Sequence, residues 1–199
     1  MIDPRLKTRR RMHVIGWSVA ALIVATAIAE RAGAFGYRGD DWSRYNQKRV
    51  TATEVLGGDT FTATLHANPQ NVVTIRLLGV DAPDGPHSHW YDEAKKYTQA
   101  RLANRSVVLR LDGTQTRDDQ DRLLAYVYIT DNDCLNVDIV RDAQAFADRR
   151  IKHTMRSAIE QVENDARKKK RGMWKNLTDD QQPAWRQDWL RKLRSTRRN

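Results

Sequence analysis

Alternating hydrophobic and polar positions divide the middle of the chain into strand-like segments. The first three, RVTATEVLG, DTFTATLH and VVTIRLLGV, begin at Arg49 and are rich in Val, Thr, Ile and Phe. Gly-Gly and Asn-Pro separate them, which predicts three strands in a meander. Two further segments, SVVLRLD and LLAYVYIT, have the same character and follow after residue 105. The pattern therefore predicts five strands.

Apolar residues recur at helical spacing between and after these strands. The segment 91–105 predicts a helix between the third and fourth strands, and the segments 135–146 and 153–174 predict two more. The last of these carries an apolar stripe opposite its charges, made of Met155, Ile159, Val162 and Ala166. Five strands with three helices fit an α+β fold, a five-stranded barrel of the oligonucleotide-binding (OB) type, although a sandwich fits the same pattern.

The N-terminal region has a different hydrophobic pattern. Residues 12–29 are uncharged and follow the basic sequence PRLKTRRRMH. A run of roughly 18 residues is long enough to cross a hydrocarbon core, and the basic flank favours a cytoplasmic N-terminus. A retained transmembrane anchor and a cleaved signal peptide both fit, and both place the body outside the cytoplasm, as a membrane-anchored or a secreted or periplasmic protein.

The hydrophobic pattern also predicts the domain organisation. We expect residues 1–34 to be the membrane-directed segment, 35–48 a linker, 49–175 the domain and 176–199 a basic, Trp-containing tail. Thr178 can cap a short amphipathic helix in this tail. Such a helix suits two roles, packing its tryptophans on the domain or contacting nucleic acid or a membrane surface, and the sequence favours neither.

The charge of the chain narrows the class of partner. Among 199 residues there are 35 Lys and Arg against 25 Asp and Glu, a formal net charge of +10, with 40% hydrophobic residues. This balance allows a globular core and favours a polyanionic partner, either nucleic acid or an anionic membrane surface. The single cysteine, Cys134, excludes an intrachain disulfide and a cysteine-based metal cage.

Charged residues stand at strand ends in three fragments. RLLGVDAPD, residues 76–84, has an arginine within an apolar strand and two aspartates beyond it. GGDTF places Asp59 at the start of the second strand, and DRLLAYVY places Arg122 at the start of the fifth. An arginine among apolar neighbours requires a buried partner or an anionic ligand.

These fragments, followed by LNVDIVR and RGMW, resemble the thermonuclease family, also called staphylococcal-nuclease-like domains. The resemblance runs from about Val50 to Trp174. It implies an OB barrel that carries a calcium-dependent phosphodiesterase, here a monomer acting on DNA or RNA.

The resemblance implies a metal site made of oxygen ligands. Asp59 and Asp81 would bind the ion directly, with the backbone carbonyl of Ala82, which stands where threonine is common. Waters and a phosphate oxygen would complete the coordination. Such ligands suit Ca²⁺ better than Mg²⁺.

The resemblance also implies three catalytic residues. Arg76 would form paired hydrogen bonds to the scissile phosphate, for which a guanidinium is better suited than an ammonium. Arg122 would stabilise the charge that builds on the phosphoryl oxygens. Asp84 would orient or deprotonate the attacking water, in a position where the family usually has glutamate.

Three further substitutions near the catalytic residues depart from the family pattern. Asp84 is one methylene shorter than glutamate, Gly57 replaces an aspartate, and Asp121 replaces a glycine before Arg122. Displacing a catalytic group by roughly 1 Å can cost about a hundredfold in rate. A catalytically impaired nucleic-acid-binding module on the same barrel is therefore the alternative to a nuclease, and a membrane-attached scaffold is a third hypothesis.

Further basic residues suggest contacts along the nucleic acid. Gln120 and Arg149 stand where the family pattern has nucleotide-stacking tyrosines, so the base contacts differ. The run KKKR is expected to strengthen binding to the phosphate backbone through Lys168, Lys169, Lys170 and Arg171. His87 and His89 have a spacing that can chelate zinc, but solvated loop residues at the rim of the site are the better interpretation.

Overall fold

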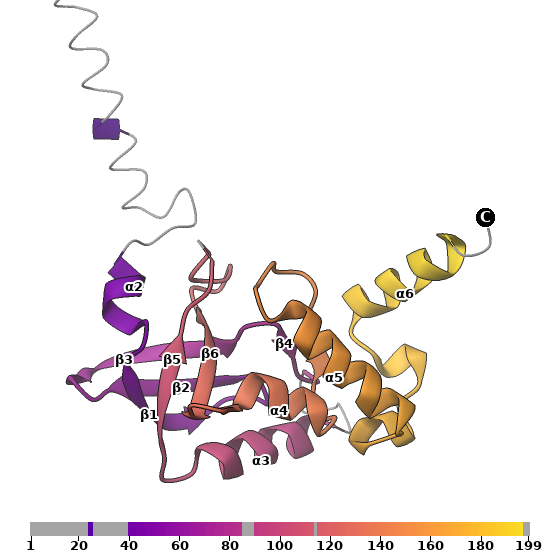
Figure 1. Ribbon diagram of the computed structural model, residues 1–199, viewed down its shortest axis with the longest axis horizontal. Coiled ribbons are helices and arrows are strands. Elements are labelled where there is room, and N and C mark those ends of the chain that lie inside the picture. Colours follow the sequence, from indigo (N-terminus) through magenta and orange to yellow (C-terminus); the bar gives the residue numbers. More distant parts are fainter. Residues whose placement is uncertain (1–23, 26–39, 85–89, 114, 197–199) are drawn as a thin grey trace, which may run out of the picture.

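A computed structural model describes residues 24–25, 40–84, 90–113 and 115–196 (Figure 1). The predicted membrane-directed segment, apart from residues 24–25, lies outside these ranges. Within them, no helix combines the length and the apolar character needed to cross a membrane.

Five strands form a closed barrel. They are β1 (Arg49–Val55), β2 (Thr60–Leu65), β3 (Asn68–Leu77), β5 (Ser106–Arg110) and β6 (Leu123–Thr130). Neighbouring strands pair antiparallel in the order β3-β2-β1-β5-β6, and a parallel pairing of β3 with β6 closes the barrel. The predicted five-stranded OB-type barrel is confirmed.

The barrel interior is filled by the apolar residues that alternate along the strands. Phe61, Ile75, Leu109, Leu123 and Val127 are all fully buried in one core. Successive side chains of a strand point to opposite faces, so one face of each strand supplies this core.

Helices cover the barrel on one side. Figure 1 shows α3 (Tyr91–Leu102), α4 (Leu135–Arg141) and α5 (Arg156–Lys168) along its lower and right-hand side. The predicted stripe of α5 is confirmed, since Ile159 and Ala166 are buried and Met155 and Val162 are partly buried against the core. Three two-residue strands complete the sheets, β4 (Val80–Asp81) paired with β8 (Phe146–Ala147), and β7 (Asp133–Cys134) beside β6.

The segment expected as a linker contains a helix, α2 (Asp40–Tyr45). Tyr45 is buried in the main core, and Asp41 accepts hydrogen bonds of 2.9 Å from both Nε and Nη2 of Arg117. Residues 40–45 thus pack on the barrel. Six residues are too few for a hydrophobic period to be recognised, which is why the sequence did not predict this helix.

The C-terminal segment also packs on the domain. It forms two 3₁₀ turns, η1 (Gly172–Lys175) and η2 (Asp179–Gln181), and then α6 (Ala184–Thr196). Thr178 precedes η2 rather than the long helix, which begins after Pro183. Arg186 of α6 is fully buried in an ion pair of 2.9 Å with Glu163 of α5. Trp185 is partly buried against the cluster that contains Phe146 and Met173, so the segment packs on the domain, and a contact with nucleic acid or a membrane surface stays a prediction.

The buried side-chain amide of Asn136 forms hydrogen bonds to the backbone at the end of the β3–β6 pairing. Asn136, at the start of α4, donates to the carbonyls of Leu78 and Ala125 at 2.9 and 3.1 Å. Its Oδ1 accepts from the N–H of Val127 at 2.9 Å. The Ala125 carbonyl also accepts from the Leu78 N–H at 3.0 Å, so the amide adds a second donor there and links β6 to the residue that follows β3.

We expect Asn136→Leu to lower the free energy of unfolding by about 3 kcal/mol, because it leaves a buried N–H and two carbonyls without this partner. Urea denaturation followed by circular dichroism measures the change. Gln144→Leu, at a half-buried position outside this network, serves as the control. An Asn136→Leu midpoint equal to that of the parent would show that these hydrogen bonds do not stabilise the barrel.

Candidate active site

A polar cleft of ≈ 630 Å³ opens at the end of β3. It brings together the predicted Arg76, Asp81, Asp84 and Arg122. Four further charged residues, which the sequence analysis did not assign to the site, line it as well: Asp118, Asp119, Asp148 and Arg150. The cleft is therefore rich in both signs of charge.

Arg76 joins the two predicted metal ligands. Its Nη1 donates to Oδ1 of Asp59 at 2.7 Å and its Nη2 to Oδ1 of Asp81 at 2.6 Å. The residues meet because Arg76 pairs with Thr60 across β3 and β2, which puts it beside Asp59. Gly79, with φ of +75°, then turns the chain so that Asp81 returns to the same guanidinium.

Burial gives these groups unusual electrostatics. Asp59 and Asp81 are each 3% exposed, and Arg76 is 8% exposed. Burial, with a smaller effect of the Asp81 charge, raises the pKa of Asp59, although Arg76 opposes the shift. Burial by itself lowers the pKa of Arg76, but the charges of Asp59 and Asp81 more than offset this and raise it. The two carboxylates thus share one cation and still repel each other.

The donor set around the carboxylates fits a hard cation. Oδ2 of Asp59 accepts one hydrogen bond, from the Ala82 N–H at 2.6 Å, and Oδ2 of Asp81 accepts one from Trp185 Nε1 at 2.8 Å. Since a carboxylate oxygen has two lone pairs, each Oδ2 has one left for an ion. No group of three or more His, Cys, Asp or Glu side chains converges within the described ranges, so other ligands would be carbonyl, water or phosphate oxygens.

Asp84 lies at the mouth of the cleft, exposed to solvent. Partial burial and the charge of Asp81 raise its pKa, while Arg76, Arg122 and Arg150 oppose the shift. The charges of three arginines and a second carboxylate therefore influence the pKa of Asp84, the residue predicted to orient or deprotonate the attacking water.

Arg122 is held by a neighbour other than Asp121. Its Nε and Nη2 each lie 2.7 Å from Oδ2 of Asp118, and its Nη1 lies 3.5 Å from the Thr60 hydroxyl. Asp121 has a left-handed φ of 61° and lies 3.7 Å from Arg117. The aspartate thus adopts the backbone conformation expected of the glycine it replaces, and the carboxylate that holds Arg122 is Asp118.

The short strand β8 delivers residues that the sequence analysis missed. Asp81 pairs with Phe146, and two residues on, the Asp148 N–H donates to the Gly79 carbonyl at 2.9 Å. Arg150 then donates to Oδ1 of Asp81 at 2.6 Å and to Oδ2 of Asp148 at 2.8 Å. The pair of arginines in DRR was the available signal, but nothing in it separates the one that faces the cleft from its neighbour.

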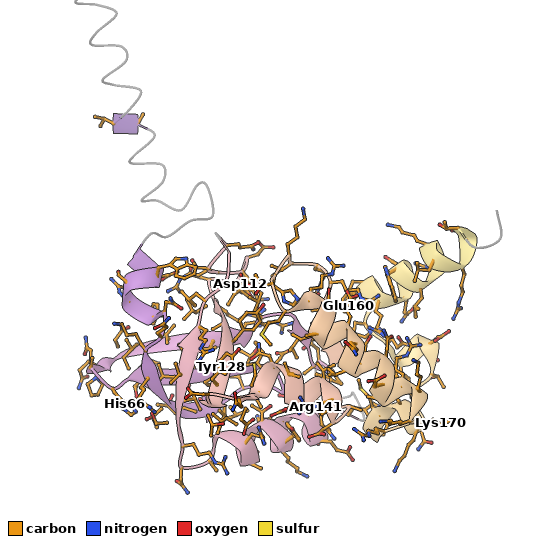
Figure 2. All side chains as sticks on the ribbon, viewed as in Figure 1. His66, Asp112, Tyr128, Arg141, Glu160 and Lys170 are labelled. Atoms are coloured by element: carbon orange, nitrogen blue, oxygen red, sulfur yellow. The ribbon has the colours of Figure 1, made fainter. Side chains whose placement is uncertain are left out.

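The other predicted nucleic-acid contacts lie outside the cleft. Arg149 lies 3.8 Å from the ring centroid of Trp189 and 3.0 Å from Glu160. Lys168, Lys169, Lys170 and Arg171 are exposed at the C-terminal end of α5. Figure 2 shows Lys170 and Glu160 toward opposite ends of this helix. His87 and His89 lie outside the described residues.

The left-handed backbone at Asp121 generates a stability prediction. We expect Asp121→Gly to keep the free energy of unfolding within about 1 kcal/mol of the parent, because glycine adopts this φ without strain. Asp121→Val should lower it by about 2 kcal/mol, since a β-branched residue is strained there. Urea denaturation of the three proteins tests this, and equal midpoints for the Gly and Val variants would contradict it.

Comparison with known proteins agrees with this geometry. Residues 74–176 match the family model described as staphylococcal nuclease homologue. A relative, the thermonuclease of Staphylococcus hyicus, is 27% identical over 164 residues, covering 79% of this chain and 94% of its own. The matched residues run from β3 to the end of η1 and include Arg76, Asp81, Asp84 and Arg122. The chain therefore belongs to the staphylococcal nuclease homologue family.

Proposed function

We propose that this protein is an exported, calcium-dependent nuclease that hydrolyses phosphodiester bonds of DNA, RNA or both. The observation that carries the proposal is Arg76, held between Asp59 and Asp81 at a cleft that also contains Arg122 and Asp84. Family membership and the similarity to a thermonuclease support the nuclease activity. The uncharged residues 12–29 support export, by an anchor or a cleaved signal.

The side chains of the cleft suit phosphodiester hydrolysis. Ca²⁺ held by Asp59 and Asp81, with the carbonyl of Ala82, would neutralise charge on the phosphate. Arg76 uses three N–H groups on Asp59, Asp81 and the Val80 carbonyl, and its remaining N–H groups would bind a phosphate oxygen.

Arg122 and Asp84 would supply the other two catalytic roles. Arg122 would donate to the phosphoryl oxygens as their negative charge increases, while Asp118 holds its guanidinium in place. Asp84 would accept a hydrogen bond from the attacking water and take up its proton, since it carries the one exposed carboxylate among the predicted site residues.

One observation favours a second function, a nucleic-acid-binding module without turnover. Asp84 is a methylene shorter than the glutamate of the family pattern, so its carboxylate reaches less far into the cleft. The arginines of the cleft would still bind phosphate in that case. The two functions differ in whether bound substrate is cleaved.

We expect Arg76→Lys to lower kcat/KM on single-stranded DNA or RNA by about a hundredfold or more, because an ammonium cannot replace a guanidinium that bridges two carboxylates and a phosphate. The assay uses the full chain with Ca²⁺ and with excess chelator, and chelation should abolish cleavage. Arg110→Lys is the matched control, because Arg110 lies over the ring of Tyr128, outside the cleft. Cleavage that survives the chelator would overturn the calcium dependence.

Restoring the longer side chain separates the two functions. We expect Asp84→Glu to raise kcat by about tenfold or more, with little change in affinity, because its carboxylate moves roughly 1 Å closer to the phosphate. Single-turnover cleavage measures this. If neither the parent nor Asp84→Glu cleaves, but both bind oligonucleotides in a salt-dependent way, the binding module is the correct function.

A further inference from the structure

A second groove, of ≈ 440 Å³, adjoins the cleft on the side of the C-terminal segment. It shares Asp81, Asp84 and Arg150 with the cleft. The other residues that line it come from the start of α6 and the segment before it, Gln181, Gln182, Pro183, Ala184 and Trp185, together with Pro83 and Phe146. The cleft and the groove therefore meet at the three shared residues.

A buried ion pair fixes this wall. Arg186 and Glu163 are both fully buried and lie 2.9 Å apart, and Nε of Arg186 also donates to Oε1 of Gln182 at 2.8 Å. Glu163 in turn accepts from the Ala147 N–H on β8 at 2.9 Å. The start of α6 is thus tied to α5 and to the strand beside Asp81, so that its position is set by the fold.

Trp185, next to the buried Arg186, is an aromatic residue that lines the groove. Its Nε1 donates to Oδ2 of Asp81 at 2.8 Å, and the guanidinium of Arg150 lies 5.0 Å from its ring centroid. The ring is half-buried and lines the groove. Because these contacts already fix its rotamer, a planar ligand that stacks on it pays little for ordering the side chain.

Arg150 places a positive charge where the cleft meets the second groove. It is paired with Asp81 and Asp148, yet its side chain is 47% exposed. The guanidinium lies over the ring of Trp185, so that donors for a phosphate stand close to an aromatic side chain on which a base can stack.

We infer that the second groove is a subsite for one nucleotide adjacent to the scissile phosphate, with its base stacked on Trp185 and its phosphate bound by Arg150. The inference rests on the proposed function, since it places this nucleotide next to the reacting one. The ligand is a single strand, because a base must leave its duplex stack to reach an aromatic side chain. Trp185 lies beyond residues 74–176, which match the family model, so the stacking residue of this subsite comes from the C-terminal segment, whereas Arg150 lies within the match.

Binding without turnover tests the subsite directly. The full chain is titrated, with chelator present, into a labelled thymidine oligonucleotide and into a series in which one base at a time is removed to leave an abasic nucleotide. We expect the parent protein to bind the oligonucleotide about tenfold more tightly than the abasic version at one position, because stacking of a base contributes roughly that much. In Trp185→Ala this difference should disappear.

Three variants separate stacking from other roles of the side chain. Trp185→Phe keeps a ring but loses the N–H to Asp81, so it should retain most of the base-dependent affinity. Trp189→Ala removes a tryptophan one turn along the same helix, where it packs on Arg149, and should leave the difference unchanged. Arg150→Ala should lower the salt dependence of binding by about one phosphate contact. The ratio of the affinities for the intact and the abasic oligonucleotide is compared for each variant, so a general loss of stability, which lowers both affinities, does not change it.

The outcomes for the subsite and for the nuclease are distinct. A parent protein that binds abasic and intact oligonucleotides equally at every position, or a Trp185→Ala variant that keeps the difference, overturns the subsite whether or not cleavage is seen with Ca²⁺. A base-dependent affinity that requires Trp185, in a protein that fails to cleave with Ca²⁺, supports the subsite and overturns the nuclease.

Discussion

The ion pairs of Arg76 with Asp59 and Asp81 are the interaction on which the site depends. Two carboxylates that are each 3% exposed are costly to bury unless a cation lies between them. The guanidinium meets this need with hydrogen bonds of 2.7 and 2.6 Å. The barrel is built to allow it, since β2 and β3 pair in the register that places Arg76 opposite Thr60 and beside Asp59.

A second buried ion pair extends the site beyond the barrel. Arg186 and Glu163 join α6 to α5, and Glu163 also binds the backbone of β8. Because β8 pairs with β4, the same contacts that hold the C-terminal helix also support Asp81. Trp185 and Arg150, from segments far apart in the chain, consequently reach the same carboxylate.

The structure accommodates the substitution at Asp121, but it does not compensate for the shorter side chain at Asp84. Asp121 adopts the left-handed backbone that a glycine would, and its side chain is directed to Arg117, so Arg122 is left to Asp118. Asp84 has no comparable compensation in its length. At the mouth of the cleft it lies near three arginines, whose charges oppose the rise of its pKa that burial and Asp81 cause.

The sequence by itself determined the elements with a long hydrophobic period and the residues that break it. Alternation predicted the five barrel strands, helical spacing predicted the stripe of α5, and Arg76 stood out because a charge within an apolar strand requires a partner. Helix α2 and the two-residue strands β4 and β8 were too short to show any period. Only the tertiary structure decided that Arg150 rather than Arg149 faces the cleft and that Trp185 binds Asp81, because both depend on contacts between residues 69 or 104 positions apart.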